Sequence, residues 1–124
     1  MSIRIINLID ITKTKDIIEI IEGFRMKLNI NDYDSQKKFW DRCIEIMSED
    51  EDKAIQFIKD NYNSEYKGYI IEIMVSYLEE TNSKKFTMEM LDFFKDIDDS
   101  YCKMSIRECV YKNDWDEEDW FDIP

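Results

Sequence analysis

The chain has 124 residues, of which 44% are hydrophobic and 14% aromatic. This size suits one domain with a single core, and the periodic spacing of the apolar residues excludes a disordered chain. Two glycines and one proline are too few turn formers for a typical all-β fold. The net charge of −12 argues against direct binding to nucleic acid or to an anionic membrane. It would attract a basic protein, although it could also serve solubility alone.

Three cysteines, Cys43, Cys102 and Cys109, lack the spacing of a metal or redox motif. We expect buried, reduced thiols in an intracellular protein. The N-terminal residues carry no small-residue cleavage site, and no stretch approaches the roughly 20 apolar residues of a membrane span. We therefore expect a cytoplasmic protein.

The N-terminal third predicts two helices after an ambiguous arm. Residues 2–12 fit either a strand or a helix turn. A helix is expected from Thr14, as a cap, to Leu28, followed by a turn at 29–33 and by a helix from about Asp34 to Met47. The inward residues of that second helix are expected to be Phe39, Trp40, Cys43, Ile44 and Met47.

The middle third predicts a short helix and then the helix that organises the fold. The sequence Ser48-Glu49-Asp50-Glu51 matches a capping box and predicts a helix that ends near Asn61. Ser64 is expected to cap a central helix that runs to Leu78. Its broad apolar stripe needs partners on more than one side and consists of Tyr66, Tyr69, Ile70, Ile73, Met74, Tyr77 and Leu78.

The last third predicts two further helices, about Ser83–Ile97 and Ser100–Lys112. The first is expected to bury Phe86, Met90, Leu91, Phe93, Phe94 and Ile97. The second carries Tyr101, Cys102, Met104, Ile106, Cys109 and Val110. An acidic and aromatic tail, residues 114–124, follows. The sequence thus predicts a single all-α domain, residues 1–124, of five to six antiparallel helices.

A sequence pattern recurs at an offset of 36 residues, in which Ser64, Lys67 and Ile70 match Ser100, Lys103 and Ile106. Such a period is typical of helix-pair repeats of the HEAT or TPR kind, although chance matches in an Ile/Lys/Glu-rich sequence could produce much of it. Either architecture would place alternate turns on one edge. The turns near Glu49–Asp52, Glu79–Glu80 and Asn113–Asp119 are all acidic, so we expect one acidic edge.

Catalytic and metal-binding chemistry finds little support in the sequence. Histidine is absent, which removes the commonest general base, and no glycine-rich phosphate loop is present. Asp96 and Asp98 begin an imitation of a calcium loop, but Tyr101 and Arg107 stand where glycine and glutamate are required. We expect a protein that is not an enzyme and has no catalytic residue, metal or cofactor.

Acidic residues beside exposed aromatic side chains suit a protein interface, because carboxylates steer a basic partner and tryptophan anchors it. The alternative is that Trp115, Trp120 and Phe121 fold back as a lid on the last helices. The candidate partner-binding residues are Glu49, Asp50, Glu51, Asp52, Glu79, Glu80, Asp114, Trp115, Asp116, Glu117, Glu118, Asp119 and Trp120.

The acidic turns, the tail and the repeat-like pattern resemble the small, acidic, all-helical immunity proteins of bacterial toxin systems. The resemblance implies binding to a toxin, often a basic nuclease, and occlusion of its active site. A second hypothesis is a helical adaptor that binds a peptide or helix in an apolar groove through residues such as Tyr66, Tyr69 or Phe94. An enzyme would need converging carboxylates with raised pKa values, which the sequence does not indicate.

Overall fold

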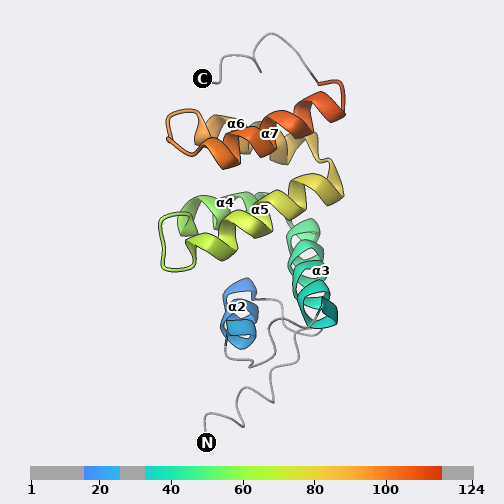
Figure 1. Cartoon of the computed structure of the whole chain (residues 1–124), viewed down its shortest axis with the longest axis vertical. Helices are drawn as coiled ribbons and strands as arrows, with labels where there is room; N and C mark the ends of the chain where they lie inside the picture. Colours follow the sequence, from blue (N-terminus) through green and yellow to red (C-terminus); the bar gives the residue numbers. More distant parts are fainter. Residues whose placement is uncertain (1–15, 26–32, 116–124) are drawn as a thin grey trace, which may run out of the picture. The chain divides into compact units, whose positions relative to one another are not determined.

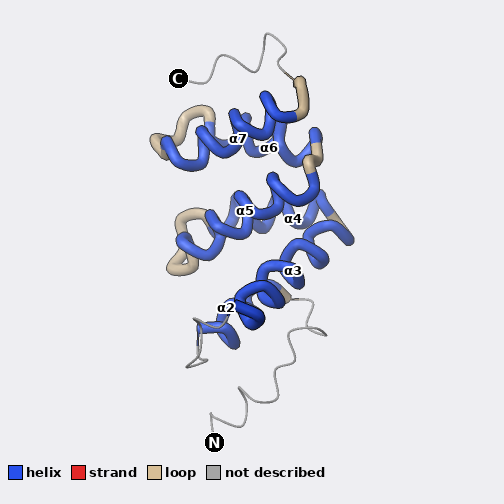
Figure 2. Tube along the Cα trace, turned by 45° about the vertical axis from the view of Figure 1, so that its right-hand side comes forward, coloured by secondary structure: helices blue, strands red, loops and turns tan. Residues whose placement is uncertain are grey.

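The computed structural model describes residues 16–25 and 33–115. Every regular element in these residues is a helix, and there are six of them (Figures 1 and 2). The predicted all-α class is therefore confirmed. The chain divides into two compact units, Met1–Asp50 and Glu51–Pro124, each of which is described by itself.

The described part of unit 1, residues 16–25 and 33–50, contains the helices α2 (Ile17–Arg25) and α3 (Tyr33–Glu49), which pack against each other. The Oδ1 atom of Asp16 accepts hydrogen bonds from the backbone N–H groups of Ile18 and Glu19, at 2.9 and 3.4 Å. Asp16 therefore caps α2. Thr14, the predicted cap, lies outside the described residues, as do residues 2–12, Leu28 and most of the predicted turn.

The predicted inward face of α3 is largely confirmed. Phe39, Cys43 and Met47 are almost fully buried. Trp40 and Ile44 are only half-buried, and the Trp40 ring meets Phe39 edge-on with 4.5 Å between the ring centroids.

Unit 2 contains the helices α4 (Glu51–Asn61), α5 (Lys67–Thr81), α6 (Lys84–Phe94) and α7 (Ser100–Lys112). The helices α4 and α5 form one hairpin, and α6 and α7 form another. The hairpins stack, because α4 packs on α6 and α5 packs on α7 (Figure 2). This arrangement is the one that two helix-pair repeats would adopt. That the hairpins are a sequence repeat stays a prediction.

The helix α5 packs on both α4 and α7, and each of the other three helices of unit 2 likewise packs on two neighbours. Its buried residues are Ile70, Ile73, Met74, Val75, Tyr77 and Leu78. They face a core supplied by the other three helices, which includes Ile58, Phe86, Met90, Phe94, Cys102, Ile106 and Val110. The predicted helix and most of its buried stripe are thus confirmed, although α5 is no more central than its neighbours. Tyr66 precedes the helix, and both Tyr66 and Tyr69 are only half-buried.

Two predicted caps are wrong. Ser64 closes a turn rather than α5: its hydroxyl donates to the Asn61 carbonyl at 2.7 Å and accepts from the Tyr66 N–H at 3.0 Å. The helix begins three residues later, after Tyr66. Ser48 lies in the last turn of α3, and Asp50 alone separates α3 from α4. The capping-box pattern therefore predicted the new helix but placed its start too early.

The ends of the last two helices follow their caps. The Oγ atom of Ser83 accepts from the Phe86 N–H, so α6 starts as predicted, but it ends at Phe94 rather than Ile97. The helix α7 has the predicted bounds and is capped by Asp99. Its cysteines are buried, whereas Tyr101 and Met104 are 49% and 59% exposed.

A Schellman motif closes α7. The Trp115 N–H donates to the Val110 carbonyl at 2.9 Å, and the Asp114 N–H donates to the Tyr111 carbonyl at 3.2 Å. Asp114 has φ of 57°, the left-handed conformation that this motif requires and that usually selects glycine. The chain therefore turns sharply at Asp114. Among the described helices, none is long and apolar enough to cross a membrane.

Candidate protein-binding surface

Hydrogen bonds gather the acidic turns of unit 2 at one end of the stacked hairpins. The side-chain amide of Asn113, just after α7, donates to Asn82 Oδ1, just after α5, at 3.1 Å. The Lys112 Nζ atom contacts the Glu79 carbonyl at 3.5 Å. The Tyr77 hydroxyl donates to Glu51 Oε2 at 2.6 Å, which brings the start of α4 to the same end.

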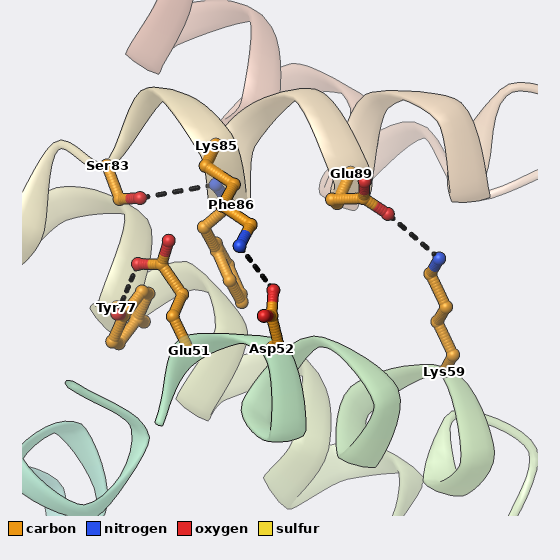
Figure 3. Close-up of polar contacts among 8 residues, drawn as sticks. All are labelled: Glu51, Asp52, Lys59, Tyr77, Ser83, Lys85, Phe86 and Glu89. Atoms are coloured by element: carbon orange, nitrogen blue, oxygen red, sulfur yellow. Dashed lines mark hydrogen bonds and ion pairs between the residues drawn. The ribbon is translucent and has the colours of Figure 1, made fainter. Parts of the chain in front are cut away.

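Two of the carboxylates at this end are engaged within the fold (Figure 3). Glu51 holds the buried Tyr77 hydroxyl, and Asp52 forms an ion pair with Lys85 at the start of α6. The hydrogen bond to Asp52 raises the pKa of Lys85. Both members of this ion pair are exposed, so it contributes little to stability.

The remaining carboxylates of this end point to solvent. Glu79, Glu80 and Asp114 are exposed, and we call these three the acidic end of unit 2. Among the other predicted binding residues, Glu49 and Asp50 are exposed in unit 1. The predicted residues Asp116, Glu117, Glu118, Asp119 and Trp120 lie outside the described residues.

Trp115 is the last described residue and is half-buried. Its backbone belongs to the Schellman motif, in which the residue after the turn commonly makes an apolar contact with the residue that its N–H bonds, here Val110. Trp115 therefore lies at the C-terminal end of α7, two residues after Asn113.

The sequence did not predict a polar cluster at the opposite end of unit 2, which consists of Tyr62, Lys67, Asp99 and Cys102. The Tyr62 hydroxyl donates to Asp99 Oδ2 at 2.6 Å, and the Cys102 N–H donates to Asp99 Oδ1 at 3.0 Å. The Lys67 ammonium lies over the Tyr62 ring, 4.4 Å from its centroid. Tyr62 and Asp99 are 37 residues apart in the chain, so the sequence predicted the helices on either side but not this hydrogen bond.

The charges in this cluster follow its geometry. Burial by itself would raise the pKa of Asp99, but the hydrogen bonds from Tyr62 and Cys102, with the Lys67 charge, bring it below its ordinary value. Burial and the hydrogen bond to Asp99 raise the pKa of Tyr62 and raise that of Cys102 to about 12. The Cys102 thiol is therefore protonated at neutral pH and is a poor nucleophile. The hydrogen bond from Tyr62 to Asp99 joins the end of α4 to the start of α7, so the role that this cluster supports is structural.

The two other cysteines are equally enclosed. Burial raises the pKa of Cys43 to about 12, and Cys109 contacts the Thr87 hydroxyl and the Leu78 carbonyl at 3.5 and 3.6 Å. Within residues 16–25 and 33–115, no group of three or more His, Cys, Asp or Glu residues is arranged to hold a metal ion. Phe94, a predicted groove residue of the adaptor hypothesis, is buried in the core.

Comparisons with protein-family models, with curated proteins and with solved structures found no match to this chain.

Proposed function

We propose that the protein is a non-enzymatic inhibitor of the immunity type, which binds a basic protein partner and blocks it. The observation that carries the proposal is the hydrogen bond between Asn113 and Asn82, because it brings the acidic turns after α5 and α7 together. Glu79, Glu80 and Asp114 then present three exposed carboxylates at one end of unit 2.

The mechanism would be steric and electrostatic occlusion. Opposite charges steer a basic partner into contact, and a carboxylate cluster can occupy the surface on which a nuclease binds phosphates. The tail that follows α7 adds four acids, Asp116–Asp119, and Trp120 to the residues that we propose for binding. The whole chain carries 29 acidic and 17 basic residues, so its own charge repels nucleic acid while it attracts such a partner.

The experiment begins with capture of the partner by the tagged full chain from its native host, at low and high salt. An inhibitor of this kind should retain one stoichiometric basic protein at low salt and release most of it at high salt, because exposed charges are screened. Retention that is equal at both salt concentrations would support the adaptor hypothesis instead.

A matched pair of variants then tests the surface with the partner so identified. The double variant Glu79→Lys and Glu80→Lys should slow association at least tenfold at low salt, since rim charges act mainly on the association rate. The control is Asp96→Lys and Asp98→Lys, which changes the net charge equally in the exposed turn between α6 and α7. Equal effects of the two doubles would mean that only net charge matters and would contradict a defined acidic surface.

A further inference from the structure

The α6–α7 hairpin carries the exposed apolar side chains of unit 2. In the described residues 51–115, the large hydrophobic side chains that are exposed all lie on these two helices: Met88, Tyr101, Met104 and Tyr111. Met88 and Met104 are 51% and 59% exposed, and Leu91, three residues after Met88, is half-buried. The hairpin α4–α5 packs on the other side of α6 and α7 (Figure 2). Methionine is flexible and polarisable, so exposed methionines are typical of binding surfaces that adapt to a partner.

Basic residues accompany these apolar side chains. Lys84 and Lys95 lie four residues before and seven residues after Met88, so all three share one side of α6. Lys103 and Arg107 are four residues apart in α7 and share a flank of that helix. We call these four cations, together with the apolar residues Met88, Leu91 and Met104, the outer face.

The charge of the outer face is opposite to that of the chain. Its four cations adjoin two acids, Asp92 and Glu108, whereas the whole chain has a net charge of −12. Charges beyond the Debye length, about 8 Å at physiological salt, are largely screened, so a short segment bound here would meet mainly the local positive charge. A long polyanion or an anionic membrane would also meet the acidic remainder of the chain and be repelled. The outer face therefore suits a short acidic segment of a protein.

The inner side of the same hairpin shows what covers a helix pair of this kind. The helices α4 and α5 pack there, and two ion pairs, Asp52 with Lys85 and Lys59 with Glu89, accompany the apolar contacts (Figure 3). A helix on the outer face, with an apolar stripe and flanking acids, would extend this stack by the same combination of contacts.

From the exposed methionines, the local positive charge and the packing on the inner side, we infer that the outer face binds an acidic amphipathic helix of a partner protein. The apolar stripe of that helix contacts Met88, Leu91 and Met104, and its carboxylates lie near Lys95 and Lys103. The inference does not depend on the proposed function, because the acidic end of unit 2 is a different surface with the opposite charge.

The test uses a synthetic peptide of about 18 residues, a length at which an isolated helix can form. Leucines stand at steps of three and four, and glutamate and alanine fill the other positions. One control peptide has the same composition in shuffled order, which removes the apolar stripe but keeps the charge. A second control has lysine in place of each glutamate, which keeps the stripe but reverses the charge.

The methionine methyl groups locate the binding in the full chain, which contains seven methionines. In protein labelled with carbon-13 at these methyls, the acidic helical peptide should move the Met88 and Met104 signals until they saturate. The signals of the buried Met47 and Met74 should stay in place and show that the fold persists. Neither control peptide should move the Met88 and Met104 signals. The single variants Met88→Leu and Met104→Leu assign these two signals.

A matched pair of charge variants tests the basic residues. The double variant Lys95→Glu and Lys103→Glu should weaken binding of the fluorescently labelled acidic peptide about tenfold at low salt, as measured by anisotropy. The control is Lys38→Glu and Lys53→Glu, which changes the net charge equally at exposed positions of α3 and α4. It should weaken binding less than about twofold, because distant exposed charges are screened. Circular dichroism checks that both double variants fold.

Four outcomes would overturn the inference. Equal effects of the two double variants, or equal binding of the shuffled peptide, would mean that only charge matters and not a defined face. Met88 and Met104 signals that move on dilution without peptide would assign the face to a second copy of the chain. Signals that respond to anionic lipid vesicles but not to the acidic peptide would assign it to a membrane. Signals that no peptide moves would leave the face without the proposed partner.

Discussion

The hydroxyl of Tyr77, a residue only 2% exposed, donates a hydrogen bond to Glu51 Oε2 at 2.6 Å, and so joins the last part of α5 to the first residue of α4. The acceptor is a carboxylate, and hydrogen bonds to charged groups are stronger than neutral ones. The same contact orients one of the acids that the sequence marks as a binding residue.

Tyr77→Phe should therefore lower the free energy of unfolding by about 1.5–3 kcal/mol, the range for a hydrogen bond to a charged group. Chemical denaturation at pH 7 measures it. Glu51→Gln keeps an acceptor oxygen and should cost less. If Tyr77→Phe left stability unchanged, the contact would not hold the α4–α5 hairpin.

The left-handed Asp114 gives a prediction with a built-in control. Asp114→Gly should raise the free energy of unfolding by about 0.5–1 kcal/mol, because glycine adopts positive φ without a steric penalty. Asp114→Ala removes the same charge but should lower stability by about 1 kcal/mol. Thermal melts of the two variants at equal salt isolate the backbone effect. Equal stabilities would contradict the Schellman geometry.

Gly68 lies in the first turn of α5 with a negative φ, and a Cβ atom added there would meet no atom within 4 Å. Gly68→Ala should raise the free energy of unfolding by up to about 1 kcal/mol, because alanine has the higher helix propensity and a more restricted unfolded state. Denaturation in urea tests this. A loss of stability would mean that α5 starts later than Gly68.

Asp99 both caps α7 and accepts from Tyr62. Its folded pKa is lower than the ordinary 3.8, so its contribution to stability is present above that value and is lost as the pH falls through the folded pKa. Asp99→Asn keeps a capping oxygen but cannot titrate, so its free energy of unfolding should fall less steeply than that of the unaltered protein as the pH drops below 4. Asp99→Ala also loses the cap and should cost about 1 kcal/mol more at pH 7. Urea denaturation from pH 2.5 to 7 gives both results.

The buried thiols predict a loss of stability in alkali. The ordinary thiol pKa is 9.0, whereas burial raises those of Cys43 and Cys102 to about 12. Between pH 9 and about 12, a thiol ionises in the unfolded chain but stays protonated in the folded protein. Each of the two cysteines should therefore lower the free energy of unfolding by about 1.4 kcal/mol for each unit of rising pH. Cys102→Ala should reduce the slope measured between pH 8 and 10.5. An unchanged slope would contradict the assignment to Cys102.

The sequence predicted the helices well where local signals and packing agree. The bounds of α7 were correct because Asp99 is a strong cap and apolar residues recur along the whole element. The prediction that Ser64 caps α5 was wrong because its hydroxyl donates a hydrogen bond to the Asn61 carbonyl and closes a turn before the helix. Met104 follows the helical period without being buried, since periodicity cannot tell whether a further helix covers a face.

The candidate surface was predictable in composition but not in detail. That acidic turns recur is visible in the sequence, and the contact of Asn113 with Asn82 brings two of them together. Which carboxylates are engaged depends on how α4, α5 and α6 pack. Asp52 meets Lys85, 33 residues further along, and no local pattern encodes that pairing.

All three cysteines lie on helices and are at most 5% exposed. A thiol reagent can therefore modify them only when the surrounding structure opens, so the rate of labelling reports local opening. Cys43 reports on α3 in unit 1, and Cys102 and Cys109 report on α7 in unit 2. The natural sequence thus carries separate reporters of the unfolding of each unit, which can be read by mass spectrometry without introducing a label.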